Sequence, residues 1–217
     1  MQTKNPDIFA ELADALETAP PDALRLRLTR ALLRLLARGA PVRVDELAVT
    51  IESAPSEVRA SLAAMPDTEY DVEGRIIGYG ITLRPTPHHF EVNQQQLYTW
   101  CAVDTLMFPG ILDRAARVES PCHATGAPIR MGVDVSGVHE LDPSTAVVSL
   151  VLPNDVRSVR TAFCNEVHFF ASPQAAEAWL AEHPGAHVIP VADAYDLGEV
   201  LFDRLLGGSG PKGKGCC

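Results

Sequence analysis

The chain has 217 residues, of which 47% are hydrophobic and 21% charged, and its formal net charge is −10. This composition excludes a disordered chain, and the negative charge argues against a broad nucleic-acid surface and against a membrane partner rich in anionic lipid. No run approaches the roughly 18 apolar residues of a membrane span and the N-terminal residues do not resemble a signal peptide, so we expect a cytoplasmic protein.

Helical periodicity and end signals predict four helices in the first third of the chain. Gly39 is a natural stop for the second helix, and Ser56 is a candidate N-cap of the fourth, which ends before Pro66. After them, "TEYDVEGRIIGYGITLRP" alternates around Glu73-Gly74 and predicts a β-hairpin. The helices are expected over residues 7–17, 22–39, 41–53 and 54–66.

Three helices followed by a hairpin, over residues 22–85, form a winged-helix pattern, which is typical of DNA readers. This segment holds nine basic and nine acidic side chains, and its would-be recognition helix, 55–65, has Arg59 as its one arginine. Phosphate binding needs an excess of lysine and arginine. We therefore expect a packing module or lid and no nucleic-acid partner.

The remainder mixes strands and helices and predicts an α+β domain. Two prolines mark a boundary near residues 84–88, and a helix is expected over 94–107. Strands are predicted over 128–136, 145–153, 166–172 and 186–191, and helices over 155–164, over 172–185 (Ser172 as its N-cap and Pro173 first) and over 192–208. The predicted organisation is an N-terminal helix or arm (1–21), a winged-helix-like module (22–87), a catalytic domain (88–207) and a flexible glycine-rich tail (208–217).

Five cysteines stand at irregular spacings, and no C-x-x-C motif is present. A zinc ribbon and a thioredoxin-like motif are therefore not supported, and in a reducing cytosol the thiols are free. The cysteines are Cys101, Cys122, Cys164, Cys216 and Cys217.

One thiol and one carboxylate share an otherwise apolar run, "YTWCAVDTLMFPG" (98–110). Cys101 and Asp104 stand three positions apart, which places them on one face of the expected helix. An anion beside a thiol raises the thiol pKa and makes it a poorer nucleophile. The pair does not suit an ordinary cysteine hydrolase; it suits a site where a proton passes between a thiol and another group.

Five segments, "TEYDVEGRIIGYGITLRPT", "LYTWCAVDTLMFP", "CHATGAPI", "AVVSLVLP" and "FCNEVHFFAS", closely resemble those of organomercurial lyases, also called alkylmercury lyases. The resemblance covers about residues 22–206. It implies a winged-helix-like helical module followed by an α/β domain with antiparallel sheet. It also implies that Cys101, Asp104 and Cys164 form the catalytic set, which sequence spacing alone does not assemble.

The resemblance implies protonolysis of a carbon–mercury bond. Two thiolates bind mercury, and Asp104 takes the proton of the second thiol and delivers it to the departing carbon. Which cysteine attacks first stays open. No organic cofactor and no structural metal are expected; cytosolic thiols would assist, and a mercuric reductase would receive the Hg(II).

Other candidates have weaker claims. Cys122, beside His123, is expected to be a buried structural thiol; His168 is expected to be an ordinary strand histidine; His88-His89 would sit in a linker with some capacity for stray metal. Trp100 and Tyr98 flank the thiol and either line the substrate pocket or pack in the core. Cys216-Cys217 either hands mercury on or is an inert tail. The rival functions are a winged-helix regulator that senses metal or oxidant and a passive thiol-based metal carrier.

Overall fold

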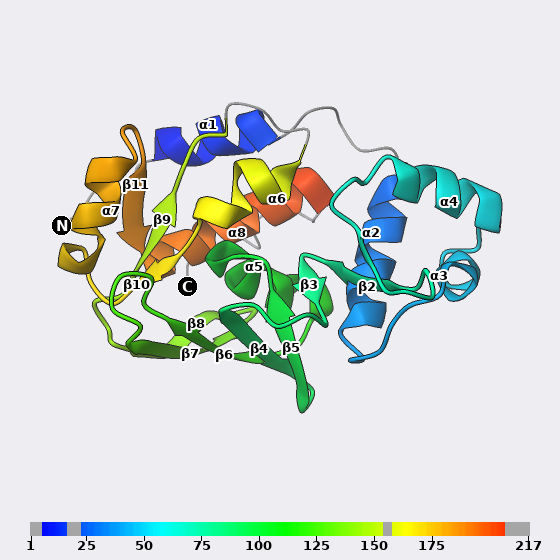
Figure 1. Ribbon diagram of the computed structural model, residues 1–217, viewed down its shortest axis with the longest axis horizontal. Helices are drawn as coiled ribbons and strands as arrows, with labels where there is room; N and C mark the ends of the chain where they lie inside the picture. The colour runs from blue at the N-terminus through cyan, green and yellow to red at the C-terminus, as the bar shows by residue number, and fades with distance from the viewer. Residues whose placement is uncertain (1–5, 17–22, 154–157, 207–217) are drawn as a thin grey trace, which may run out of the picture.

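The computed structural model describes residues 6–16, 23–153 and 158–206, and its N-terminal part is helical. Helices α2, α3 and α4 form a small module at one end of the molecule, whereas α1 packs on the C-terminal helix α8 (Figure 1). Apolar side chains at helical spacing bury one face of α2, and Gly39, with φ +77°, follows its end. The bounds are α1 Pro6–Leu16, α2 Ala23–Leu36, α3 Val44–Thr50 and α4 Pro55–Ala63.

A large antiparallel sheet joins the helical module to the rest of the molecule. It has eight strands in the order β1-β2-β3-β5-β4-β6-β7-β8, so the hairpin of the winged-helix pattern continues into the sheet of the second domain. The boundary predicted at residue 87 falls between β3 and β4 of this sheet. The strands are β1 Glu69–Tyr70, β2 Ile76–Tyr79, β3 Ile81–Thr82, β4 His88–Val92, β5 Gln95–Thr99, β6 Ala116–Pro121, β7 Pro128–Asp134 and β8 Gly137–Asp142.

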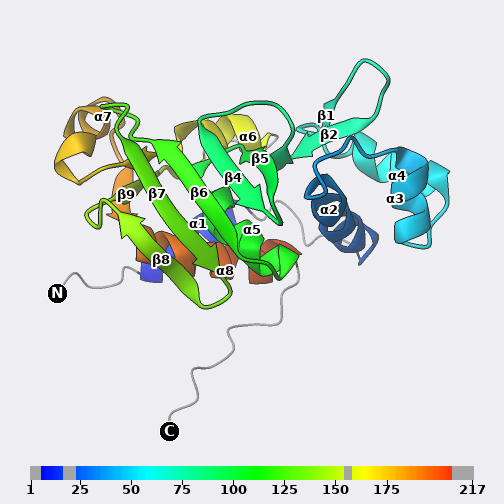
Figure 2. The same ribbon diagram turned by 90° about the horizontal axis from the view of Figure 1, so that it is seen from below.

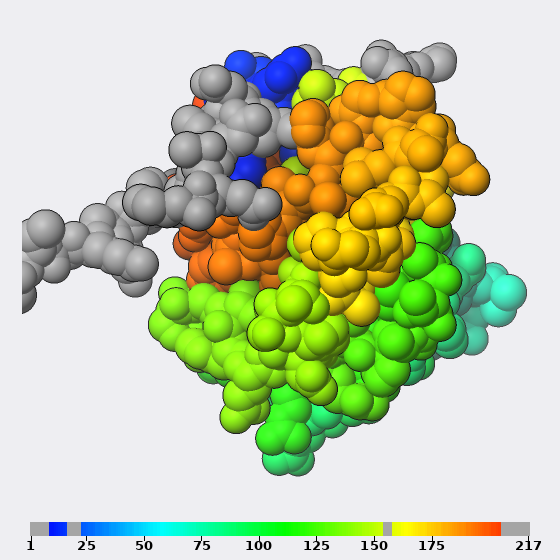
Figure 3. Space-filling view, turned by 90° about the vertical axis from the view of Figure 1, so that its left-hand side faces the viewer, coloured from blue at the N-terminus to red at the C-terminus, as the bar shows by residue number. Residues whose placement is uncertain are grey.

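A second, three-stranded antiparallel sheet has the order β10-β9-β11. Helices α5 and α8 pack against each other behind the large sheet (Figure 2), and the segment that carries α7 forms the surface above that sheet on one side (Figure 3). The remaining bounds are α5 Ala102–Leu112, β9 Val147–Leu150, α6 Val159–Ala162, the 3-10 turns η1 Cys164–Glu166 and η2 Gln174–Ala176, β10 Phe169–Phe170, α7 Glu177–Glu182, β11 His187–Pro190 and α8 Val191–Leu206.

This architecture confirms the expected α+β class, with a helical module followed by a domain of antiparallel sheet. One apolar core runs through both parts, from Leu28 and Leu32 of α2 to Phe90 of β4 and Leu197 of α8. Helix α5 is apolar on all sides and is almost wholly buried, which is typical of a central core helix. No helix among the described residues is both long and apolar enough to cross a membrane.

The prediction of a helix over residues 94–107 is wrong for the first half of that range. Residues Gln95–Thr99 form β5, because they pair with β4 through a two-residue turn. Asn93 and Gln94 both have positive φ in this turn, at 50° and 64°, the geometry that suits the twist of a hairpin. The pairing with neighbouring strands overrides the local helical spacing.

Two smaller expectations are also wrong. His88 and His89 lie in β4 and not in a linker; His88 is 4% exposed, and its Nδ1 lies 3.0 Å from Ser120 Oγ. The N-cap of α4 is Ala54 and not Ser56, because Pro55 occupies the first helical position and the Glu57 carboxylate accepts the Ala54 N–H at 3.0 Å.

Candidate active site

Cys101 stands at the start of α5, where strand β5 has just ended. It is the N-cap residue, with an extended backbone (φ −147°, ψ 173°), and its carbonyl accepts the Thr99 hydroxyl at 3.0 Å. The next residue, Ala102, donates its N–H to the Val167 carbonyl at 3.1 Å. The thiol therefore sits at a fixed helix N-terminus, and not in mid-helix as the sequence had suggested.

Asp104 occupies the third position of α5, one turn from its N-cap. It is 7% exposed, and its Oδ2 is buried without a hydrogen-bond partner among the described residues. Burial raises the pKa of this carboxyl to about 7, although hydrogen bonds from Cys101 and Trp100 and the charge of Arg160 act in the opposite direction. Close to neutral pH, Asp104 can therefore both accept and release a proton.

Cys164 lies beside Cys101 and Asp104, although it belongs to a later segment of the chain. Helix α6, capped by Ser158 whose Oγ accepts the Thr161 N–H at 3.1 Å, leads into the 3-10 turn η1 that begins with Cys164. The thiol is 5% exposed. Because Val167 follows directly after η1, its hydrogen bond with Ala102 fixes the two cysteine-bearing segments against each other.

The structure brings Cys101, Asp104 and Cys164 together, and their ligand atoms all lie within 4.8 Å of one another. Burial raises the pKa of Cys101 well above its ordinary value, and a hydrogen bond with Cys164 and the charge of Asp104 add to the effect. The hydrogen bond with Cys101 lowers the pKa of Cys164, but burial and the charges of Asp104 and Asp67 outweigh it and the net pKa is raised. Both thiols thus hold their protons until a strongly thiophilic ligand displaces them.

Two thiols and one carboxyl in a buried group can bind a soft metal ion and move a proton beside it. Thiolates are the ligands that soft ions prefer, whereas hard cations require several oxygen ligands. The group offers two sulfurs and a single carboxyl, a set of ligands that suits a soft ion better than a hard one.

The aromatic and charged side chains around the thiols come from three parts of the chain. Trp100 precedes Cys101, meets the Tyr79 ring edge-on with centroids 5.6 Å apart, and carries the Arg160 guanidinium over its face at 4.9 Å. Tyr98, the other aromatic candidate, contacts the His89 ring, with centroids 5.0 Å apart. Sequence reasoning missed Tyr79 and Arg160, because no local pattern places either of them near Cys101.

Among the described residues, neither Cys122 nor any histidine belongs to this group. Cys122 follows β6, is 1% exposed and accepts the Ala171 N–H at 3.3 Å, and it does not belong to the trio. His123 and His168 stack on each other, with ring centroids 3.9 Å apart. Cys216 and Cys217 lie outside the described residues.

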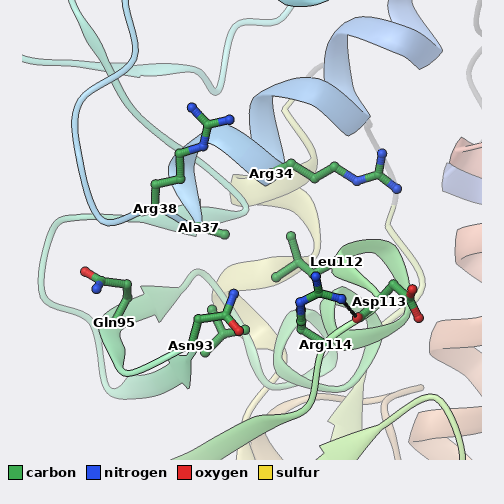
Figure 4. Close-up of a pocket in the computed structure, with 9 residues that line it drawn as sticks. Arg34, Ala37, Arg38, Asn93, Gln95, Leu112, Asp113 and Arg114 are labelled. Atoms are coloured by element: carbon green, nitrogen blue, oxygen red, sulfur yellow. Dashed lines mark hydrogen bonds between the residues drawn. The ribbon is translucent and has the colours of Figure 1, made fainter.

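A surface cavity of about 620 Å³ lies at the opposite end of α5, between α2 and the β4–β5 turn. Figure 4 shows that the Arg38 guanidinium points away from the other labelled side chains, and Arg38 pairs with Glu46 at 3.3 Å. None of the predicted site residues lines this cavity, so it is not part of the thiol site. Its lining consists of Arg34, Ala37, Arg38, Val92, Asn93, Gln95, Leu112, Asp113 and Arg114.

Two family models match the chain in succession. Residues 7–80 match a model described as the helix-turn-helix domain of alkylmercury lyase, and residues 81–203 match one described as alkylmercury lyase. The mercury-bound crystal structure of MerB2 has a similar fold, with a TM-score of 0.77 over 91% of this chain and 98% of that one. At 21% identity this last likeness concerns the fold alone.

Several relatives are similar over most of their length. The chain is 54% identical to an alkylmercury lyase of Streptomyces lividans over 217 residues, which cover 100% of both chains. It is 50% identical to one of Bacillus cereus over 190 residues, 88% of this chain and 87% of that one. It is 46% identical to one of Pseudomonas putida over 175 residues, 81% and 82% of the two chains.

Proposed function

The chain belongs to the alkylmercury lyase family, whose members are enzymes that cleave carbon–mercury bonds, and on that basis we propose that Cys101, Cys164 and Asp104 are its catalytic residues. The observation that supports the proposal most is the buried group in which the three ligand atoms lie within 4.8 Å of one another. Organomercurials are the substrates, and mercury enters as substrate and not as a resident cofactor.

The reaction begins when one thiol loses its proton to solvent and its sulfur binds the mercury of R–Hg⁺. The order of attack by Cys101 and Cys164 is open. The second thiol then gives its proton to Asp104 as its sulfur binds the same mercury. The raised pKa of Asp104, about 7, suits a carboxyl that must take up a proton and give it away again.

Cleavage is a proton-for-mercury exchange at carbon. Two thiolates on mercury increase the electron density on the bound carbon and make it more basic. The carbon–mercury bond breaks with its electron pair on carbon, and that pair takes the proton from Asp104. The products are R–H and Hg(II) held by two sulfurs, and the exchange needs neither an oxidant nor a reductant.

Benzene release from phenylmercury tests the proposal. With excess thiol present, we expect Cys101→Ser, Cys164→Ser and Asp104→Asn to lower kcat by at least about 100-fold, the usual contribution of a positioned acid–base group. Cys122→Ser removes a buried thiol outside the trio and is the matched control. Turnover of the three site variants close to that of the control would refute the assigned roles.

The second candidate function is that of a passive metal carrier. The Asp104→Asn variant distinguishes a carrier from a lyase. A carrier needs sulfur ligands but no proton relay, so Asp104→Asn would bind Hg(II) and behave as the parent does. We expect the variant to bind Hg(II) but to release almost no benzene.

The regulator suggested by the winged-helix pattern is not favoured. The helix-turn-helix model that matches residues 7–80 describes a domain of alkylmercury lyase itself. The pattern therefore accompanies the enzyme and does not indicate DNA binding.

We also propose that Hg(II) leaves through thiol exchange, first to cytosolic thiols and then to a mercuric reductase. Cys216 and Cys217, which lie outside the described residues, are the candidate hand-off pair, since a ten-residue tail has an r.m.s. reach of roughly 17 Å. No organic cofactor is needed, because the reaction uses only a proton and thiols. A chain without its last two residues is expected to keep turnover but to transfer Hg(II) more slowly to purified reductase; equal transfer rates would remove the tail from the proposal.

A further inference from the structure

Glu69 is a buried carboxylate in the hairpin of the helical module. It lies on β1 and is 8% exposed. Its Oε2 accepts the Thr82 hydroxyl at 2.5 Å, and its Oε1 pairs with the guanidinium of Arg160. A buried carboxylate needs such partners, because removal from water is costly for an unpaired charge.

The strand register creates the place for this carboxylate. Glu69 stands opposite Gly78 on β2, and Gly78 stands opposite Thr82 on β3, so the three residues form one row across the hairpin. A Cβ at Gly78 would overlap the Glu69 Oε2 and would lie 2.8 Å from the Thr82 Oγ1. The missing side chain at Gly78 therefore lets the threonine hydroxyl reach Glu69 across β2.

Arg160 connects this row to the thiol site. It belongs to α6, the helix before Cys164, and its guanidinium lies over the Trp100 ring at 4.9 Å. This guanidinium pairs with one buried carboxylate, Glu69, and its charge also acts on a second, Asp104. Within the described residues, Asp104 Oδ2 has no hydrogen-bond partner.

We propose that Glu69 is a positioning residue of the lyase reaction: it holds the Arg160 guanidinium over Trp100 and so keeps that guanidinium away from the Oδ2 of Asp104. A guanidinium has five donors in a fixed fork and binds carboxylates in pairs of hydrogen bonds. Bound to Asp104 in this way, it would occupy the carboxylate oxygens that the proposed proton transfer needs. The inference rests on the proposed role of Asp104.

The competing explanation is that Glu69 only fastens the helical module to α6. Asp67 offers a matched comparison, because it accepts the Ser158 hydroxyl at 2.5 Å and the Arg160 backbone N–H at 3.3 Å. Asp67 thus ties the same two parts together without an ion pair to the Arg160 side chain. If Glu69 only fastens the two parts, substitution of either carboxylate should change kcat to a similar extent. If Glu69 positions Arg160, substitution of Glu69 should lower kcat much more than substitution of Asp67.

The test compares Glu69→Gln with Asp67→Asn for benzene release from phenylmercury, with rates expressed per mercury-binding site. We expect Glu69→Gln to lower kcat by about 10- to 100-fold with little change in KM, because substrate binding depends on the thiols. The kcat of Asp67→Asn is expected within about threefold of the parent value. The inference would be overturned if Asp67→Asn and Glu69→Gln lowered kcat equally. It would also be overturned if Glu69→Gln lowered only the number of mercury-binding sites and not the rate per site.

A double variant isolates the route through Arg160. If Glu69 acts by restraining Arg160, the kcat of Glu69→Gln/Arg160→Gln will be no lower than that of Glu69→Gln. Additive losses of kcat contradict the inference.

Where Glu69→Gln does not fold, Gly78→Ala displaces the Glu69 oxygen without a change of charge and is expected to lower kcat as well. An active Asp104→Asn variant would refute the proposed role of Asp104 itself, whereas an inactive Asp104→Asn with a normal Glu69→Gln refutes only the positioning role.

Discussion

The sulfur atom of Cys101 lies within 4.8 Å of that of Cys164, although the two residues stand far apart in the sequence. Backbone contacts hold them there: Ala102, next to Cys101, donates its N–H to the carbonyl of Val167, which follows the turn of Cys164. The fold itself thus holds the two thiols together. A preformed two-thiol site loses less conformational entropy when it takes up its ion.

The first prediction concerns the reactivity of these thiols. Because both are buried and both have a raised pKa, iodoacetamide should label Cys101 and Cys164 slowly in the native protein near pH 8. One equivalent of Hg(II) should then protect both after unfolding, as read by mass spectrometry of peptides. Protection of Cys122 in place of either residue would contradict a shared site.

The second prediction concerns stability and pH. The Asp104 pKa is about 7 in the folded protein against 3.8 as its ordinary value, so the folded state binds this proton more tightly than the unfolded state does. Folding stability from this group therefore falls as pH rises from about 4 to 7. Asp104→Asn removes the penalty and should be more stable than the parent at pH 8, by up to about 4 kcal/mol.

Urea unfolding of both proteins across this pH range gives the comparison. The difference in unfolding free energy between Asp104→Asn and the parent should grow with pH and then level off above pH 7. If this difference in unfolding free energy is the same at every pH, the pKa of Asp104 is not raised in the folded protein.

The third prediction concerns the junction between the helical module and α6. Ser158 both caps α6 and donates its hydroxyl to Asp67 at 2.5 Å. Ser172 is a matched control, since its Oγ accepts the Ala175 N–H at 3.2 Å beside η2 but, among the described residues, makes no hydrogen bond to the helical module. Ser158→Ala should cost about 1 to 2 kcal/mol of unfolding free energy and Ser172→Ala about half as much. Equal costs would mean that the bond to Asp67 contributes nothing.

Much of the fold was predictable because the local signals agree with the global structure. Helices α1, α2, α3 and α4 and the hairpin at Glu73-Gly74 follow from periodicity and stop residues. The start of α5 was not predictable in this way, because residues 95–99 gain more from pairing with β4 than from continuing a helix. Strands β4 and β8 were likewise missed.

The site divides in the same manner. Cys101 and Asp104 could be paired from sequence because both belong to one short run, even though Cys101 proved to be an N-cap. Their partner Cys164 came only from resemblance to a family, since a pairing between distant segments depends on tertiary structure. Glu69 and Arg160 carried no sequence signal, because their contact joins the hairpin to a helix far along the chain.

The last prediction concerns Gly80, which connects the hairpin to the helix that carries Asp104. Gly80 has φ +73°, its carbonyl accepts the Trp100 N–H at 3.0 Å, and a Cβ there would overlap the ring of Phe108 on α5. Gly74 has nearly the same φ, +75°, and a Cβ there would meet nothing within 4 Å, so Gly74 measures the backbone strain alone.

Gly74→Ala should therefore cost about 1 kcal/mol of unfolding free energy, and Gly80→Ala about 3 kcal/mol or more, since the ring must also move. Phe108 lies one turn after Asp104 on α5, so its displacement should lower kcat for phenylmercury in Gly80→Ala but not in Gly74→Ala. Thermal or urea unfolding and benzene release, measured on the same samples, test both the predicted loss of stability and the predicted loss of kcat. If the two variants lose equal stability and equal activity, the contact between Gly80 and Phe108 does not support the site.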